Sequence, residues 1–187
     1  MAQKKIDQPI VIGHSLGGYV ALAMAKKHSE SFAGLGLFQS TAYPDSEEKK
    51  TNRNKVIEFV KTHGIDQFID TFVPGLFFEK KHPAIPVVFK IARQTSTETL
   101  VGYAAAMRDR NSSIDFIKNY KRPMLILGGD QDTIIPGEVM QELGRLAPYS
   151  VIHLLKDTSH MAMYESPDET TKIVEIFARK IADADRS

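Results

Sequence analysis

The chain has 187 residues, 42% of them hydrophobic and 25% charged, which is the size and balance of one globular domain with a sizeable core. Its formal net charge of +1 gives no reason to expect nucleic acid or an anionic membrane as a partner. Cysteine is absent, so disulfides and thiolate metal sites are excluded. No apolar run approaches the roughly 18 residues of a membrane span, and no signal peptide opens the chain, so we expect a cytoplasmic protein.

The first predicted unit, residues 1–40, contains two strands and a helix. Residues 9–13 form a short β-branched apolar run that ends in glycine, which is typical of a buried parallel strand. Residues 15–28 repeat apolar side chains with a helical period. Residues 32–38 are again apolar and predict a second buried strand.

The middle of the chain, residues 41–120, has a different pattern. It contains four amphipathic or apolar helix candidates and no strand signal. We therefore predict a helical insertion that forms a lid, with helices over residues 46–63, 65–78, 85–94 and 96–110.

The strand pattern returns in residues 121–187. Strands are predicted over residues 123–127 and 150–155, and helices over residues 136–146 and 167–182. Alternation of this kind predicts an α/β fold, in which a parallel sheet of about four strands carries helices on both faces.

The most specific motif is the run Gly-His-Ser-Leu-Gly-Gly at residues 13–18, which matches G-x-S-x-G between a predicted strand and a predicted helix. Such a turn exposes the serine hydroxyl at the carboxyl end of the sheet. Glycines two residues before and after Ser15 allow the strand and the helix to approach each other. The N–H of Leu16, at the helix start, is a candidate donor to an oxyanion.

A serine nucleophile needs a base, and the base needs an orienting acid. Two aspartates follow the third predicted strand. We favour Asp132, in the turn before the next helix, and expect Asp130 to cap the turn by accepting backbone N–H bonds.

Six histidines are candidates for the base. His160 follows the last predicted strand after a short loop, which brings it to the carboxyl edge of the sheet. His14 adjoins the serine but is expected to point away from it, because neighbouring side chains diverge at a turn. The others are expected to pack or to be solvated: His28, His63, His82 and His153.

Three segments together resemble the α/β-hydrolase superfamily, in its lid-bearing, esterase-like branch. They are residues 9–18, 123–136 and 159–165. The resemblance extends over almost the whole chain and implies a catalytic triad of Ser15, Asp132 and His160, with Leu16 as a backbone oxyanion donor. It implies serine-hydrolase activity that needs no cofactor.

The family has further strands before the nucleophile strand, and a His-Gly loop there supplies the second oxyanion donor. Here residues 1–7 resemble only the end of the preceding helix, so the resemblance implies an N-terminally truncated chain. The strand around Ile10 and Ile12 would then be an open, apolar edge. We expect self-association through this edge, or pairing with a separate piece that supplies the missing strands.

The chemistry expected is the cleavage of a small or medium, mostly apolar carboxylic ester through an acyl-enzyme. Amide hydrolysis, carbon–carbon bond hydrolysis and perhydrolysis use the same triad and stay open. A catalytically inactive fragment, a ligand-binding protein or a scaffold is the alternative, because one oxyanion loop is missing. No metal site is indicated. The predicted acyl pocket is lined by Phe72, Phe77, Tyr103, Met107 and Met161.

Overall fold

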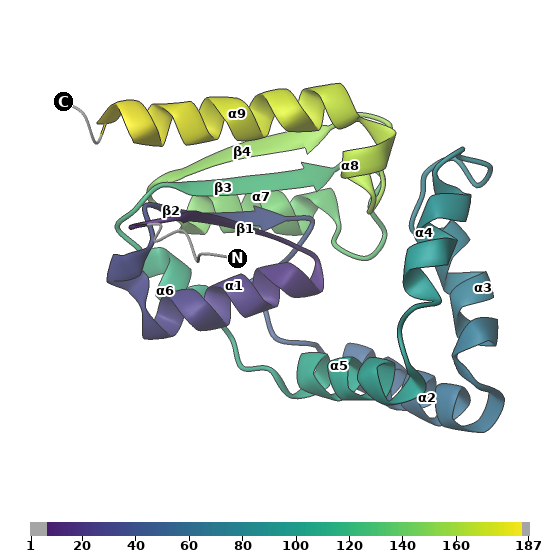
Figure 1. Ribbon diagram of the computed structural model, residues 1–187. Helices are drawn as coiled ribbons and strands as arrows, with labels where there is room; N and C mark the ends of the chain where they lie inside the picture. Colours follow the sequence, from purple (N-terminus) through teal and green to yellow (C-terminus); the bar gives the residue numbers. More distant parts are fainter. Residues whose placement is uncertain (1–6, 185–187) are drawn as a thin grey trace.

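The computed structural model describes residues 7–184, and within them four parallel strands form one sheet in the order β1-β2-β3-β4 (Figure 1). This confirms the α/β prediction. Strands β2 and β3 are buried along their whole length, which explains their runs of apolar residues, whereas β4 exposes residues 151–153. The strands are β1 (Ile10–His14), β2 (Gly34–Phe38), β3 (Met124–Gly129) and β4 (Ser150–Leu155).

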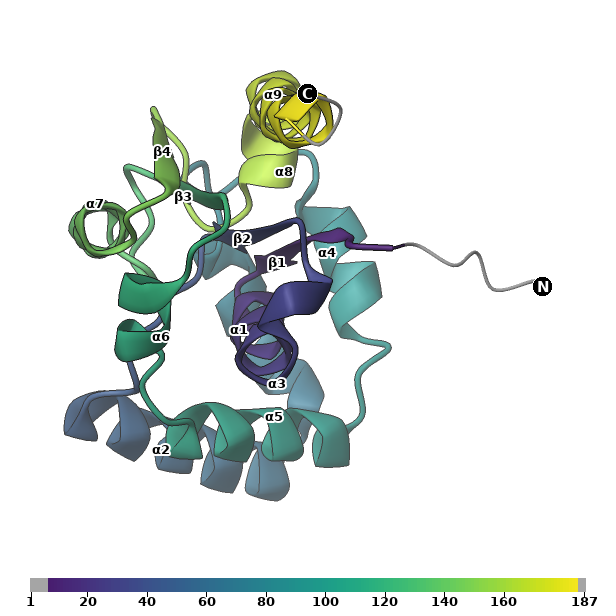
Figure 2. The same cartoon turned by 90° about the vertical axis from the view of Figure 1, so that its left-hand side faces the viewer.

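Helices cover both faces of the sheet, as predicted (Figures 1 and 2). One face packs against α1 (Leu16–Lys27), α6 (Ile114–Asn119) and α7 (Gly137–Leu146), and the other against α8 (Ala162–Glu165) and α9 (Pro167–Ala184). Alternate residues of β3 serve the two cores: Met124 and Ile126 face the first group of helices, and Leu125 and Leu127 face α8 and α9.

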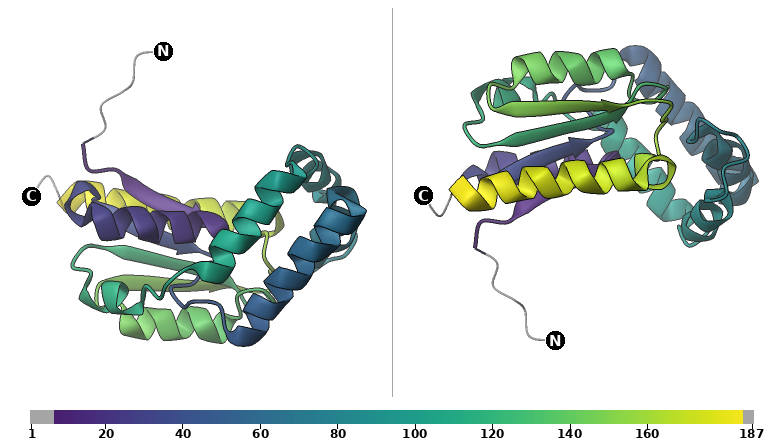
Figure 3. Two further views of the ribbon diagram at one scale, coloured as in Figure 1. Left: turned by 90° about the horizontal axis from the view of Figure 1, so that it is seen from below. Right: turned by 90° about the horizontal axis from the view of Figure 1, so that it is seen from above.

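Between β2 and β3 the chain forms four further helices, which we call the helical segment. They are α2 (Glu47–His63), α3 (Ile65–Gly75), α4 (Ile85–Ala92) and α5 (Thr97–Asp109). Serine hydroxyls cap two of them: Ser46 accepts a hydrogen bond from the N–H of Lys49, and Ser96 accepts one from Thr99, each at 3.2 Å. Views from below and from above show that the segment projects from the body that contains the sheet (Figure 3).

The helical segment has a small core of its own. Helices α3 and α4 and the connection between them bury Ile69, Val73, Phe77 and Val88 together. The sheet domain contributes Met161 to the same cluster. The segment therefore touches the domain where Met161 lies, just beyond the carboxyl end of β4.

The two ends of the helical segment meet at a buried carboxylate. Asp45 accepts hydrogen bonds from Arg53 Nε at 3.1 Å and from Arg110 Nη1 at 2.8 Å. The Arg110 guanidinium also donates to the carbonyl of Tyr43, and its carbon lies 4.0 Å from the ring centroid of Tyr19 in α1. Asp45 thus ties the entry and the exit of the segment to each other, and Arg110 ties them to the sheet domain.

Two short helices were not predicted: α6, which buries Ile117 in the core of the first face, and α8, which follows His160. A short 3-10 helix, Ser29–Ser31, also precedes β2. Of residues 1–7, predicted to resemble the end of a helix, residues 1–6 lie outside the described part. Within residues 7–184, each helix is too short or too polar to cross a bilayer.

Candidate active site

Ser15 occupies the sharp turn between β1 and α1. Its backbone has φ 50° and ψ −117°, in the region that non-glycine residues rarely adopt. The N–H of Ser15 donates to the carbonyl of Phe38 at the end of β2, at 2.9 Å, which fixes the strained residue from the neighbouring strand. The side chain is left partly exposed at the carboxyl edge of the sheet.

The glycines around Ser15 differ in what they allow. A Cβ atom on Gly13 would overlap the backbone of Gly17, so the close approach of strand and helix requires a glycine there. A Cβ atom on Gly18 would overlap the Ser40 side chain, whereas one on Gly17 would meet nothing within 4 Å. Gly18 is therefore required by its contact with Ser40, whereas the position of Gly17 has room for a side chain.

The structure brings Ser15, His160 and Asp132 together. Nε2 of His160 lies 2.9 Å from Oγ of Ser15, and Nδ1 of His160 lies 2.7 Å from Oδ2 of Asp132. A carboxylate only accepts hydrogen bonds, so Nδ1 carries the proton and Nε2 of the neutral ring is free to accept the serine proton. His160 and Asp132 are 3% and 4% exposed, so their contact is shielded from water.

Asp132 is held in its turn by backbone donors. Its Oδ1 accepts from the N–H groups of Ile134 at 2.8 Å and Ile135 at 3.0 Å. Asp130, the alternative acid, is exposed, and its carboxylate accepts only a long hydrogen bond from Thr158, at 3.4 Å. Asp130 therefore braces the loop after β4, and Asp132 alone of the two contacts the imidazole.

The loop that carries His160 crosses the end of the sheet to reach Ser15. It passes so close to Gly129, at the end of β3, that a Cβ atom there would overlap the Thr158 carbonyl. Gln39, fully buried after β2 and at φ 48°, holds the loop on both sides of His160. Its amide nitrogen donates to the Ser159 carbonyl, and its amide oxygen accepts from the N–H of Ala162 at 3.2 Å.

The same loop is bonded to the helical segment. The N–H of His160 donates to the carbonyl of Leu76, just after α3, at 2.9 Å. The carboxylate of Glu165 accepts from Ser159 at 3.0 Å and from Met161 at 3.2 Å with one oxygen, and from Phe78 at 2.6 Å with the other. Glu165 thus links the residues on either side of His160 to the helical segment.

His14 lies beside the base, a contact that was not predicted; the prediction said only that its ring points away from Ser15. Its Nε2 lies 2.9 Å from the carbonyl oxygen of His160, and because a carbonyl only accepts, His14 donates. Burial of the ring lowers the pKa of His14, and the nearby imidazole of His160 lowers it further. The sequence could have indicated this role only through adjacency to Ser15, since the partner is 146 residues away.

The remaining predicted residues lie in varied settings. As the first residue of α1, Leu16 has a backbone N–H without an intrahelical partner, beside the Ser15 hydroxyl. Phe77 and Met161 are buried in the cluster of the helical segment, Phe72 and Tyr103 are exposed, and Met107 is half-buried. Their role in an acyl pocket stays a prediction.

The other histidines lie away from Ser15. His63 stacks on Phe59, His82 stacks on Phe77, and His28 and His153 are exposed. Within residues 7–184 no three acidic or histidine side chains gather in a way that would hold a metal ion.

This strand–serine–helix turn on a parallel sheet matches a known family. The chain belongs to the alpha/beta hydrolase family, whose sequence model matches residues 2–173. The resemblance to the α/β-hydrolase superfamily inferred from the three motifs is thereby confirmed.

Similar proteins include lipases and esterases. Lipase 1 of Psychrobacter immobilis is 26% identical, and the match covers 93% of this chain and 56% of the lipase. A thermophilic esterase from Thermogutta terrifontis superposes with a TM-score of 0.83 at 32% identity, covering 94% of this chain and 66% of the esterase. An enol-lactonase from Burkholderia xenovorans LB400, 24% identical with a TM-score of 0.80, shares the fold. The chain thus spans little more than half the length of the lipase.

Proposed function

We propose that this chain carries the catalytic triad of a serine hydrolase that cleaves carboxylic esters through an acyl-enzyme. The observation that carries the proposal is the continuous hydrogen-bonded series from Ser15 Oγ through the His160 ring to Asp132. The tautomer that this series requires leaves Nε2 of His160 as a proton acceptor next to the hydroxyl. The similarity to a lipase and to an esterase supports the ester as the bond attacked.

In the first half of the proposed reaction, Ser15 Oγ attacks the ester carbonyl carbon while His160 Nε2 takes the hydroxyl proton. The imidazolium formed is stabilised by the carboxylate of Asp132. When the tetrahedral intermediate collapses, the bond to the alcohol oxygen breaks and His160 returns its proton to that oxygen. The alcohol leaves, and the acyl group stays on Ser15 as an ester.

In the second half, water attacks the acyl carbon and His160 Nε2 accepts one of its protons. Collapse of this intermediate breaks the bond to Ser15 Oγ, which recovers its proton from His160, and a carboxylic acid is released. The N–H of Leu16 is the proposed donor to the oxyanion in both halves. One such donor changes the rate by about 10²–10³-fold.

We propose that the helical segment is a lid over an apolar acyl site for small or medium esters. Two observations support this: the Leu76 carbonyl accepts the N–H of His160 itself, and Met161 packs into the core of the segment. Rates over a series of p-nitrophenyl esters of increasing acyl length test the idea. A preference for charged or strongly polar acyl groups contradicts it.

The triad itself is tested with a fluorophosphonate probe, which reacts with an activated serine only. We expect the wild-type chain to be labelled and Ser15→Ala to be unlabelled. Ser31→Ala, which removes an exposed serine before β2, is the matched control and should label like wild type. A wild-type chain that folds but does not label would favour the alternative of a hydrolase fold used for binding.

We also propose that the open edge of β1 pairs with another strand, from a second copy of the chain or from a separate segment. Among the described residues β1 pairs only with β2. Its side chains are apolar on both faces, with Val11 toward α1 and Ile10 and Ile12 toward α9. Sedimentation of the chain as a stable monomer over a wide concentration range would reject self-association.

A further inference from the structure

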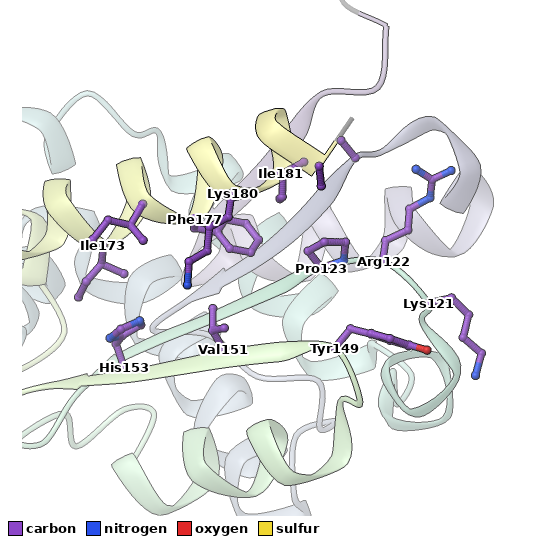
Figure 4. Close-up of a pocket in the computed structure, with 13 residues that line it drawn as sticks. Lys121, Arg122, Pro123, Tyr149, Val151, His153, Ile173, Phe177, Lys180 and Ile181 are labelled. Atoms are coloured by element: carbon purple, nitrogen blue, oxygen red, sulfur yellow. The ribbon is translucent and has the colours of Figure 1, made fainter. Parts of the chain in front are cut away.

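A cavity, here called the groove, lies between α9 and the strands β3 and β4, away from Ser15 (Figure 4). Its volume is about 390 Å³, within the range of about 300–1,000 Å³ that is usual for small-molecule sites. It is lined near the amino ends of β3 and β4, whereas Ser15, Asp132 and His160 follow the carboxyl ends of their strands. The cavity is therefore separate from the proposed active site.

The walls of this cavity are apolar. Strand β4 contributes Val151, and α9 contributes Ile173, Ile176, Phe177 and Ile181. Val151 and Ile176 are 41% and 45% exposed, so their apolar surface faces solvent in the chain as described. Exposed apolar side chains gathered in a concave site are typical of a place where an apolar ligand binds.

The charged side chains of the cavity are all cationic: Lys121, Arg122 and Lys180, with no carboxylate in its lining. Lys180 extends from α9 toward the strands, and Lys121 and Arg122 lie where β3 begins (Figure 4). Arg122 is already paired with Glu30, at 3.2 Å. In the part of the chain that the structure describes, no ion pair joins Lys121 or Lys180 to a carboxylate, so both ammonium groups are available to an anion.

We propose that this groove binds a single-chain amphiphile with a carboxylate head, such as a medium-chain fatty acid. The alkyl chain lies along Val151, Ile176 and Phe177, and the carboxylate accepts a hydrogen bond from Lys180, which extends toward the strands, while Lys121 at the other end of the groove adds positive charge. Charge decides between this ligand and a second copy of the chain. Two copies meeting through this face would bring their lysines together, and like charges disfavour that contact.

The proposal does not depend on the hydrolase activity, since a fatty acid is not an ester and binding alone is measured. The probe is sodium decanoate, kept below the concentration at which it forms micelles. Binding is followed by NMR of a chain labelled at the isoleucine methyl groups. Ile173, Ile176 and Ile181 report on the groove, and Ile134, next to Asp132, reports on the active site.

We expect the signals of the groove methyl groups to shift in a saturable way. The methyl signal of Ile134 should not shift. Lys121→Gln/Lys180→Gln should weaken decanoate binding about tenfold, because the charge-assisted hydrogen bond from Lys180 and the positive charge of Lys121 are lost. Lys172→Gln, an exposed lysine of α9 outside the groove, is the matched control and should bind like wild type. Decanol, with the same chain and no charge, should bind about tenfold more weakly than decanoate.

Three results would overturn the proposal. Shifts confined to Ile134 would assign decanoate to the active site. Equal binding by wild type and the double lysine variant would show that the cations do not recognise the head group. Groove signals that change with protein concentration in the absence of decanoate would show that a second copy occupies the face.

Discussion

The sheet domain and the helical segment differ in how completely their central elements are buried. In the domain, β2 and β3 are buried along their whole length. The helical segment buries a small cluster between α3 and α4 but leaves Phe72, Val87 and Ile91 between 43% and 54% exposed. The central strands are therefore fixed by packing on both faces, whereas the helices of the segment leave a large part of their apolar surface exposed.

The two regions are joined at two places of different character. At the base of the segment, the buried carboxylate of Asp45 is the link. At the site, Glu165 and the Leu76 carbonyl bond the segment to the loop of His160. The comparison predicts that changes in the domain act on chemistry, changes at Asp45 act on stability, and changes at Glu165 act on both regions at once.

The largest effect is expected for Asp132→Asn. An asparagine keeps an oxygen for the N–H groups of Ile134 and Ile135, so the turn persists, but it favours the wrong tautomer of His160. We expect kcat to fall by about 10⁴-fold with little change in thermal stability. Steady-state kinetics and circular dichroism measure the two quantities.

The matched control is Asp130→Asn, two residues away and exposed, which should leave kcat nearly unchanged. If both variants lost activity equally, the assignment of the acid from geometry would be wrong.

The next effect is on stability, at the base of the helical segment. Asp45→Asn removes the charge that two arginines share, and we expect the free energy of unfolding to fall by about 3 kcal/mol. Asp70→Asn removes the partner of Arg93 in a pair whose side chains are 54% and 53% exposed, and should cost less than about 1 kcal/mol. Urea unfolding measures both. Equal losses of unfolding free energy in the two variants would mean that Asp45 is as solvated as the surface pair.

A smaller effect is expected where the two regions share the Glu165 carboxylate. Glu165→Gln leaves one oxygen and one NH₂ group for N–H donors on Ser159, Met161 and Phe78, so at least one donor loses its acceptor. We expect kcat/KM to fall about tenfold, because a hydrogen bond to a charged group is lost. The amide of Phe78 should also exchange faster in deuterium oxide.

The control for Glu165→Gln is Glu169→Gln, an exposed residue in the first turn of α9. If Glu165→Gln slowed catalysis but left the amide hydrogen exchange of Phe78 unchanged, Glu165 would act only on the loop that carries His160.

The sequence predicted the parts of the molecule that local patterns determine. The four strands are short apolar runs bounded by turns, and Ser15, Asp132 and His160 follow three of them, so their convergence at one edge follows from parallel pairing. Helix α6 was missed because it has only six residues, too few to show a helical repeat in the sequence. It is stabilised by the burial of Ile117. Tertiary contact, not propensity, forms such a helix.

The supporting residues of the site could not be predicted for a different reason. Gln39 and Glu165 act through hydrogen bonds to backbone atoms, and a backbone partner leaves no trace in residue type. Asp45 could not be predicted because its partners, the side chains of Arg53 and Arg110, are eight and 65 residues away in the chain. The groove beside α9 is made by segments that are adjacent only in the folded chain.

The smallest effect concerns pH and the buried ring of His14. Burial first, and then the neighbouring His160, lower the pKa of His14 from its usual value of 6.5. The unfolded chain therefore binds more protons at this residue below pH 6.5 than the folded chain does. Stability from the neutral ring is fully present above that pH and is lost as the pH falls below it.

The test compares the free energy of unfolding of wild type and His14→Gln at about pH 7.5 and about pH 5.5. The difference between them should shrink on acidification, because the variant has no imidazole to protonate. His153→Gln, on an exposed ring of β4, removes a histidine away from the site and should show a smaller change. If the curves for His14→Gln and wild type ran parallel, His14 would titrate as a solvated group. Its bond to the His160 carbonyl would then not persist in solution, and the loop would depend on Gln39 and Glu165 for its position.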